Sequence, residues 1–108
     1  MPNAPVEKQP QLITSPDNKL QIISHAAAGD MFGCYTTKGV IKNISSEADV
    51  NVEIKVEYYD INGEKIDSEV DTFYIPFPGG SRAFHIIYPG SRYDDVKAYR
   101  IYPTAKDA

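Results

Sequence analysis

The sequence predicts an all-β protein, built as an antiparallel sandwich or barrel, and three observations support this fold class. Eight tyrosines and four phenylalanines stand against no tryptophan, and aromatic residues of this kind favour strands. Eight prolines and seven glycines divide the chain at short intervals, as turns between short strands do. No segment has an apolar face that repeats every 3.6 residues, so very little helix is expected.

Length and composition describe a single folded domain. The chain has 108 residues, of which 42% are apolar and 24% are charged, which is ordinary for a globular protein. A chain of this size buries about two-thirds of its unfolded surface, enough for one core without disulfides or metals. The size excludes a large cofactor-binding enzyme. The 15 acidic against 11 basic residues, with a pI near 5.0, argue against binding to nucleic acid.

The expected domain is flanked by two less ordered segments. Residues 1–19 contain four prolines among mostly polar neighbours and are expected to form a flexible lead-in. The folded domain is expected over 20–102, and 103–108 are expected to be a short polar tail. Turn signals separate six strand-like runs inside the domain, expected at 20–27, 34–43, 50–59, 65–75, 81–88 and 95–102.

The strongest strand signal lies at 50–59, where apolar and polar residues alternate, and 65–75 alternates in a similar way. The length of the loop between them decides which side chains share a face. A two-residue loop would place acidic residues on the apolar face, which burial disfavours, whereas a three-residue loop with Gly63 at positive φ avoids this. The expected register then pairs Tyr58 with Ile66, Val56 with Ser68 and Ile54 with Val70.

This expected register gathers acidic side chains on the outer face of the hairpin. It places Glu57 opposite Asp67 and Glu53 opposite Asp71, and like charges in directly opposed positions destabilise a sheet. Three explanations compete: the face is only solvated and screened, it attracts a basic partner surface, or it binds Ca²⁺ loosely. The acidic residues concerned are Glu53, Glu57, Asp67, Glu69 and Asp71.

Several short motifs resemble those of the FxLYD domain family over about residues 20–102. A G-x-V-x-N strand end lies at 39–43 and is followed by a polar turn, and a Tyr-Asp pair at 59–60 precedes a glycine. A turn rich in proline and glycine then precedes a strand with Phe84, and the last strand carries Tyr99. The positions that give the family its name hold Val56 and Tyr58 here, so core volumes are redistributed. The residues expected to carry the shared structure are Gly39, Asn43, Tyr59, Asp60, Gly63, Phe84 and Tyr99.

The resemblance implies an immunoglobulin- or fibronectin-like antiparallel β-sandwich of about seven strands. Domains of this kind occur mainly in exported or surface-tethered prokaryotic proteins, and the family pattern contains no catalytic residue. We therefore expect an extracellular or envelope-associated module whose signal or anchor lies upstream of this sequence. No window of about 18 consecutive apolar residues occurs, so no membrane span is expected within it.

Few side chains are available for catalysis or metal binding. The only imidazoles are His25 and His85, both inside expected strands, and the only thiol is Cys34, expected in a buried strand. A hydrolytic site needs a nucleophile, a histidine base and an orienting acid, and zinc needs at least three closely spaced ligands. Neither pattern is present in the sequence. We expect no enzyme activity, no metal site and no cofactor.

The most promising functional feature is aromatic. Tyrosine, phenylalanine and arginine gather around the two Pro-Gly turns near 76–80 and 89–92, and such residues favour recognition of proteins, while tyrosine also stacks on sugars. Some of these rings are alternatively part of the core. The candidate partner-binding residues are Phe77, Arg82, Tyr88, Arg92 and Tyr93. The expected function is a structural, adhesion or protein-interaction module, and the alternative is a module that binds a peptide or glycan through loops at 73–93.

Overall fold

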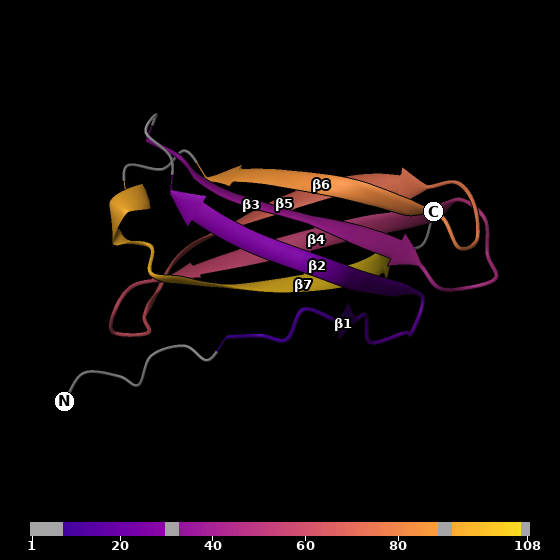
Figure 1. Cartoon of the computed structure of the whole chain (residues 1–108), viewed down its shortest axis with the longest axis horizontal. Coiled ribbons are helices and arrows are strands. Elements are labelled where there is room, and N and C mark those ends of the chain that lie inside the picture. The colour runs from indigo at the N-terminus through magenta and orange to yellow at the C-terminus, as the bar shows by residue number, and fades with distance from the viewer. Residues whose placement is uncertain (1–7, 30–32, 89–91, 107–108) are drawn as a thin grey trace.

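The computed structural model describes residues 8–29, 33–88 and 92–106, and it confirms the predicted fold class (Figure 1). Two antiparallel β-sheets pack face to face as a sandwich, and the described residues contain a single turn of 3₁₀ helix. The elements are β1 (Ile13–Thr14), β2 (Leu20–Gly29), β3 (Tyr35–Asn43), β4 (Val50–Tyr59), β5 (Lys65–Ile75), β6 (Ser81–Tyr88), η1 (Tyr93–Asp95) and β7 (Ala98–Lys106).

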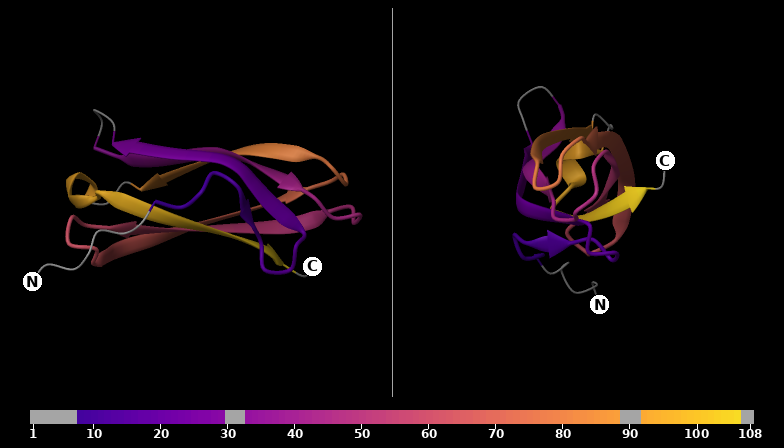
Figure 2. Two further views of the ribbon diagram at one scale, coloured as in Figure 1. Left: turned by 60° about the horizontal axis from the view of Figure 1, so that its bottom comes forward. Right: turned by 90° about the vertical axis from the view of Figure 1, so that its right-hand side faces the viewer.

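The strand order defines the two layers that are visible in Figure 2. One sheet has the order β1-β2-β3-β6 and the other has the order β5-β4-β7, with every described pairing antiparallel. An immunoglobulin constant domain instead orders its strands A-B-E-D and C-F-G. The molecule therefore has the sandwich architecture with its own strand connections.

The core lies between the inner faces of the two sheets, and β4 is its centre. Alternate residues of β4 from Val50 to Tyr58 are buried, as the period of two in the sequence predicts. Tyr58 is 0% exposed, stacks on Tyr88 with ring centroids 4.6 Å apart, and meets the edge of Tyr35 at 5.7 Å. Burying each large apolar side chain stabilises the fold by about 1.5–3 kcal/mol.

Gly39 is required by packing rather than by a turn. It lies opposite Phe84 in the β3–β6 ladder, and a Cβ atom at this position would collide with the Phe84 ring and with the carbonyl oxygen of Ser24. Phe84 itself is buried, 4% exposed. The absence of a side chain at Gly39 thus makes the space that the Phe84 ring fills.

The β4–β5 turn forms as predicted, but the expected register of the hairpin is wrong. Gly63 has φ +80°, and Asp60 binds the backbone of Glu64 across the loop. One residue further along, Ile66 has no partner in the ladder, which is a β-bulge. The bulge shifts the register by one residue from the expected one. Tyr58 therefore pairs with Asp67, Val56 with Glu69 and Ile54 with Asp71.

The acidic residues of β5 consequently lie on the core side of their sheet. Such a placement is tolerated because β5 is the outermost strand, where a carboxylate on the inner face still reaches water. Asp67 is exposed, and Glu69 and Asp71 are half-buried. The predicted outer face with opposed acidic pairs does not form, because Glu57 lies opposite Ser68 and Glu53 opposite Thr72.

Both ends of the folded part extend beyond the expected limits of 20 and 102. β7 continues to Lys106, with Pro103 buried. At the other end, the side chain of Gln9 binds the backbone N–H and C=O of Ile101 on β7, and that of Gln11 binds the same groups of His25 on β2. We call residues 9–11 the strap. The strap and β1 run along the side of the sandwich where β2 and β7 lie (Figure 1), while residues 1–7 of the expected lead-in lie outside the described residues.

Candidate functional site

The five candidate partner-binding residues do not form one surface. Arg82 and Tyr88 lie near opposite ends of β6, about 20 Å apart at strand spacing, and Phe77 lies beyond the Arg82 end. Tyr88 is 4% exposed and belongs to the core, where it stacks on Tyr58. Arg92 is exposed and pairs with Asp95 at 3.1 Å. The side chain of Tyr93, at the start of η1, lies outside the described residues.

Tyr88 is therefore a buried core residue, whereas its place beside a turn predicted that its side chain would be exposed. Burial raises the pKa of its hydroxyl, and the negative charge of the Asp67 carboxylate raises it further. Opposed to these, the charge of Arg92 lowers the pKa.

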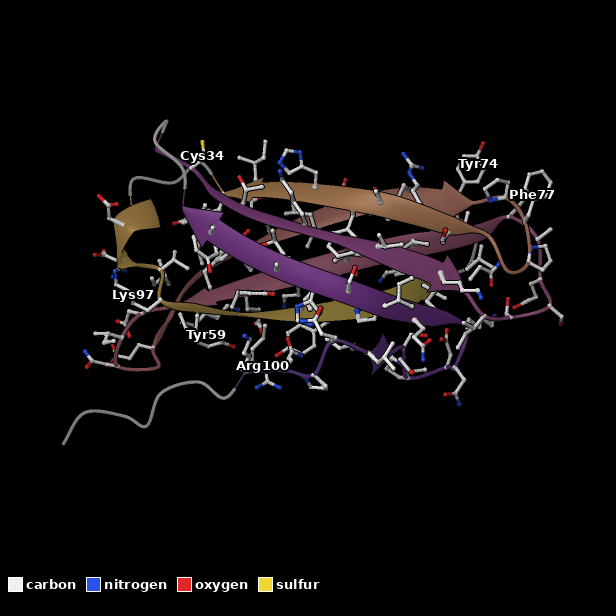
Figure 3. The ribbon with its side chains drawn as sticks, in the orientation of Figure 1. Cys34, Tyr59, Tyr74, Phe77, Lys97 and Arg100 are labelled. Carbon is white, nitrogen blue, oxygen red and sulfur yellow. The ribbon has the colours of Figure 1, made fainter. Side chains whose placement is uncertain are left out.

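An exposed aromatic surface forms at the opposite end of β6, around the β5–β6 turn. We call this surface the hairpin patch and define it as Phe73, Tyr74, Phe77 and Arg82. Phe77 is 70% exposed and Tyr74 is 54% exposed, and both project at the same end of the molecule (Figure 3). The Arg82 guanidinium lies 4.6 Å above the centre of the Phe73 ring and donates to the Tyr74 carbonyl oxygen at 3.4 Å. The cation is thereby held in place among the rings.

Asn43 holds the turn that displays Phe77. Its side chain is fully buried, and Nδ2 donates to the carbonyl oxygens of Glu47 at 2.8 Å and Phe77 at 3.4 Å. Oδ1 accepts from the N–H and the hydroxyl of Ser45. Backbone hydrogen bonds also join Asn43 to the glycines at 79 and 80. One asparagine therefore fixes two loops, 44–49 and 76–80, against each other.

The outer face of the β5-β4-β7 sheet is balanced in charge. Glu57 pairs with Lys65 at 2.8 Å and with Lys55 at 3.8 Å, and Glu53 pairs with Lys106 at 3.4 Å. The hydrogen bond from Lys65 lowers the pKa of Glu57. Burial raises the pKa of the neighbouring Tyr59 to about 12, and the Glu57 charge adds to this effect. Among the described residues no group of three or more side chains could hold a metal ion, so no calcium site is formed there.

The histidines and the cysteine lie apart. His25 is buried, with Nδ1 beside the Tyr99 hydroxyl and Nε2 beside the Pro10 carbonyl oxygen. His85 is exposed and lies opposite Lys38, about 13 Å along β3 from Cys34 at strand spacing. Cys34 is half-buried and precedes β3, not inside a buried strand as expected. The geometry assembles no nucleophile–base pair from these three residues.

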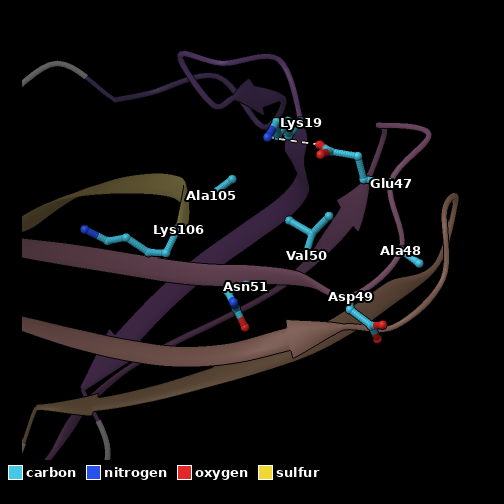
Figure 4. A pocket seen from close by; sticks show the side chains of 8 residues that line it. All are labelled: Lys19, Glu47, Ala48, Asp49, Val50, Asn51, Ala105 and Lys106. Atoms are coloured by element: carbon cyan, nitrogen blue, oxygen red, sulfur yellow. Dashed lines mark ion pairs between the residues drawn. The ribbon is translucent and has the colours of Figure 1, made fainter. Parts of the chain in front are cut away.

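Neither of two hollows on the described surface exceeds the lower end of the size range of ordinary ligand pockets. One of about 180 Å³ lies beside the 44–49 loop, where Lys19 and Glu47 form an ion pair at 3.0 Å (Figure 4). Another of about 300 Å³ lies against His25 and Gly39 and is open to solvent. Pockets for small ligands usually measure about 300–1,000 Å³ and enclose most of the ligand. The exposed hairpin patch is accordingly the most prominent candidate for recognition.

The comparisons with known proteins give structural neighbours only. No family model matches the chain, and no curated protein sequence matches it. The chain is similar to the crystal structure of Campylobacter jejuni cj0090, with a TM-score of 0.57, 15% identity, and coverage of 79% of this chain and 85% of that one. It is also similar to a DUF1425 family member from a Shewanella species, with a TM-score of 0.60, 15% identity, and coverage of 82% and 78%. At this identity the likeness shows the sandwich fold.

In the described segments no helix is long and apolar enough to cross a membrane.

Proposed function

We propose that the chain is a non-catalytic protein-interaction module of the cell envelope and that it binds its partner through the hairpin patch. The observation that carries this proposal is the exposure of Phe77 and Tyr74 next to Arg82. Exposed rings beside an immobilised arginine are the residue types that dominate binding energy at protein interfaces. The envelope location rests on the sequence resemblance to FxLYD domains.

The residues that hold the hairpin patch in place favour a role in binding over a role as a simple spacer. A binding surface loses less conformational entropy when its side chains are held before the partner arrives. Asn43 supplies that rigidity at the turn, and the Phe73 ring supplies it for Arg82. A spacer would need neither an exposed ring at the tip of a turn nor a buried asparagine below it.

Site-specific photo-crosslinking tests the proposal. A photoreactive phenylalanine analogue replaces Phe77 in the full chain expressed in its native cells, and a matched variant carries it at Ile61. Ile61 is 68% exposed in the β4–β5 turn, at the opposite end of the sandwich, and is therefore a fair control. We expect a discrete protein adduct from position 77 that disappears when Arg82→Ala is added. Equal adducts from both positions, or none from position 77, would contradict the proposal.

A further inference from the structure

The outer edge of β5 has no strand paired to it in the described part of the chain, although side chains bind three backbone groups of β5. Asp67 Oδ1 accepts from the Ser68 N–H, Asp71 Oδ1 accepts from the Thr72 N–H, and Arg82 donates to the Tyr74 carbonyl oxygen. On its other side β5 pairs with β4. Every second residue of such an edge directs its N–H and C=O groups away from the sheet, where another strand can bind them. At 11 residues, β5 is the longest strand in the described part of the chain.

On the opposite side of the sandwich, the strap lies along the edges of β2 and β7. There the strap binds the backbone of His25 on β2 and of Ile101 on β7 through two glutamine side chains. These amide groups occupy positions that a neighbouring strand would use. The chain therefore lays a separate segment along the strand edges on one side of the sandwich, whereas on the other side only side chains, and no segment of the described chain, bind the backbone of β5.

Asp67, Glu69 and Asp71 give this edge its charge. They alternate along the core side of β5, with about 7 Å between successive positions. None of the ion pairs between described residues includes them, since the nearby lysines Lys55 and Lys65 pair with Glu57 on the other face. Oδ1 of Asp67 accepts from the Ser68 N–H and Oδ1 of Asp71 from the Thr72 N–H, and each carboxylate has a second oxygen with which to accept from a basic side chain.

The other face of the same edge is apolar at intervals. Val70 is 51% exposed and Tyr74 is 54% exposed, and both alternate with the acidic residues along β5. Tyr74 also belongs to the hairpin patch, so the edge and the patch are continuous. The two faces of β5 thus offer different chemistry to a strand placed beside it, acidic on the core side and apolar on the outside.

We propose that the edge of β5 binds an extended segment of a partner protein in which lysine or arginine alternates with apolar residues. The segment adds to the sheet as a fourth strand next to β5. Side chains in directly opposed positions of two paired strands lie on the same face. The basic residues of the segment therefore meet Asp67, Glu69 and Asp71, and its apolar residues lie beside Val70 and Tyr74. This inference rests on the proposed function, because it names the kind of segment that the module binds.

Charges that point inward from an edge strand also protect a sheet against unwanted pairing. That role alone predicts that the edge rejects every strand, whereas our proposal predicts that it rejects acidic and neutral strands and accepts basic ones. Binding of a suitable peptide distinguishes the two roles.

The probe is a short synthetic peptide in which lysine and valine alternate, added to the full chain at low salt. We expect chemical-shift changes in the backbone amides of β5 and few in β7, measured by nuclear magnetic resonance. A peptide of the same composition with its lysines contiguous, and one with alternate backbone amides methylated, should bind at least about tenfold more weakly, since a factor of ten corresponds to the loss of a few weak contacts. Equal binding of either control peptide, or no binding of the alternating one, overturns strand addition.

Two protein variants test the acidic row. D67N/E69Q/D71N removes the three charges of the row, and E47Q/E64Q/D94N removes the same number of charges elsewhere from a formal net charge of −4. We expect at least about a tenfold loss of affinity in the first variant and less than about a twofold loss in the second. If the first variant does not fold, as judged by circular dichroism, E69Q alone replaces it. Equal losses in both variants would show that net charge alone attracts the peptide and would overturn the proposal.

Together, the peptide experiment and the crosslinking experiment distinguish failure of the strand proposal from failure of the proposed function. A peptide that leaves β5 unperturbed, while position 77 still forms its adduct, overturns the strand proposal and leaves the hairpin patch in place. Peptide binding at β5 without an adduct at position 77 supports the strand proposal and overturns the hairpin patch as the contact surface.

Discussion

The hydroxyl of Tyr99 lies 2.5 Å from Nδ1 of His25, and this contact joins a strand of one sheet to a strand of the other. Nε2 of the same ring lies 2.8 Å from the carbonyl oxygen of Pro10, which can only accept a hydrogen bond. In the neutral imidazole Nε2 therefore carries the proton, and Nδ1 accepts from Tyr99. One buried histidine links β2, β7 and the strap.

Replacing Tyr99 with phenylalanine tests this link. The variant keeps the ring, whose edge-on contact with His25 has a centroid distance of 5.6 Å, but removes the hydroxyl and leaves a buried nitrogen unpaired. We expect the free energy of unfolding to fall by about 1–3 kcal/mol in urea denaturation. Tyr102→Phe is the control, because its hydroxyl is bound at the surface by Arg100 and should matter little. A loss no larger than that of the control would contradict the role of the contact.

The strap can be released without changing the core. Gln9→Ala together with Gln11→Ala removes the four hydrogen bonds that the two side chains make to β2 and β7. The amides of His25 and Ile101 should then exchange with deuterium faster than in the native chain, while the amides of β4 keep their protection. Gln21→Ala, which removes only a surface bond to Thr14, is the matched control. Unchanged exchange rates at both amides would contradict the protection of β2 and β7 by the strap.

Asn43→Ala should loosen both loops at the hairpin patch. The substitution leaves the Ser45 N–H and the Glu47 carbonyl without their side-chain partner, and each of these partly buried hydrogen bonds contributes about 0.5–1.5 kcal/mol to stability. We expect a lower melting temperature and faster exchange of the Ser45 and Gly79 amides. Asn43→Asp keeps the acceptor and loses the donor, so it should retain the Ser45 contact and lose those to Glu47 and Phe77. Equal behaviour of the two variants would show that hydrogen bonding of the side chain is unimportant.

Gly63 is the position in the β4–β5 turn that requires a residue able to adopt positive φ. Its φ of +80° strains a β-branched side chain, so Gly63→Val should destabilise the fold by at least about 1–2 kcal/mol. Gly63→Asn should cost less, because asparagine enters the left-handed region more easily. Chemical denaturation of both variants measures the difference. A valine variant as stable as the asparagine variant would contradict the strained turn.

Alkaline pH should unfold the protein through its buried tyrosines. Burial raises the pKa of Tyr99 to about 12, and Tyr35, Tyr58 and Tyr88 are shifted in the same direction, from an ordinary value of 10.0. A hydroxyl with a higher pKa in the folded state holds its proton longer than in the unfolded chain. The stability it contributes is therefore complete below pH 10 and is lost as the pH rises from about 10 to about 12. Denaturation at a series of pH values, with tyrosinate absorbance followed in parallel, should show unfolding and ionisation together, whereas tyrosinate formation in a folded protein would contradict this.

The alternation in the sequence was enough to locate the long strands. The expected runs 50–59, 65–75 and 81–88 coincide with β4, β5 and β6, because burial of one face imposes a period of two that few other structures produce. The same reasoning failed at Ile66. A bulge there costs little at an edge strand, yet it transfers every following side chain of β5 to the other face.

The candidate site was harder to predict than the fold. Tyr88 follows the alternating pattern of β6 and is buried, but its nearness to a Pro-Gly turn suggested exposure. Gln9 and Gln11 carry no periodic signal, since each acts through one amide that imitates strand pairing. Arg82 and Phe77 could be identified by residue type, and only the fold separated them from Tyr88 and Arg92. Residue type thus indicated which side chains could bind a partner, and the strand connections determined where on the molecule these side chains lie.

The hydrogen bonds between Gln9 and Ile101 join residues that are 92 positions apart in the chain. β4, the central strand of its sheet, likewise needs β7 on one side. Contacts of such long range form late, because the closure of a large loop must precede them. During synthesis, the strap would therefore stay undocked from β7 until Ile101 has left the ribosome. We accordingly expect the strap to attach after the local hairpins have formed.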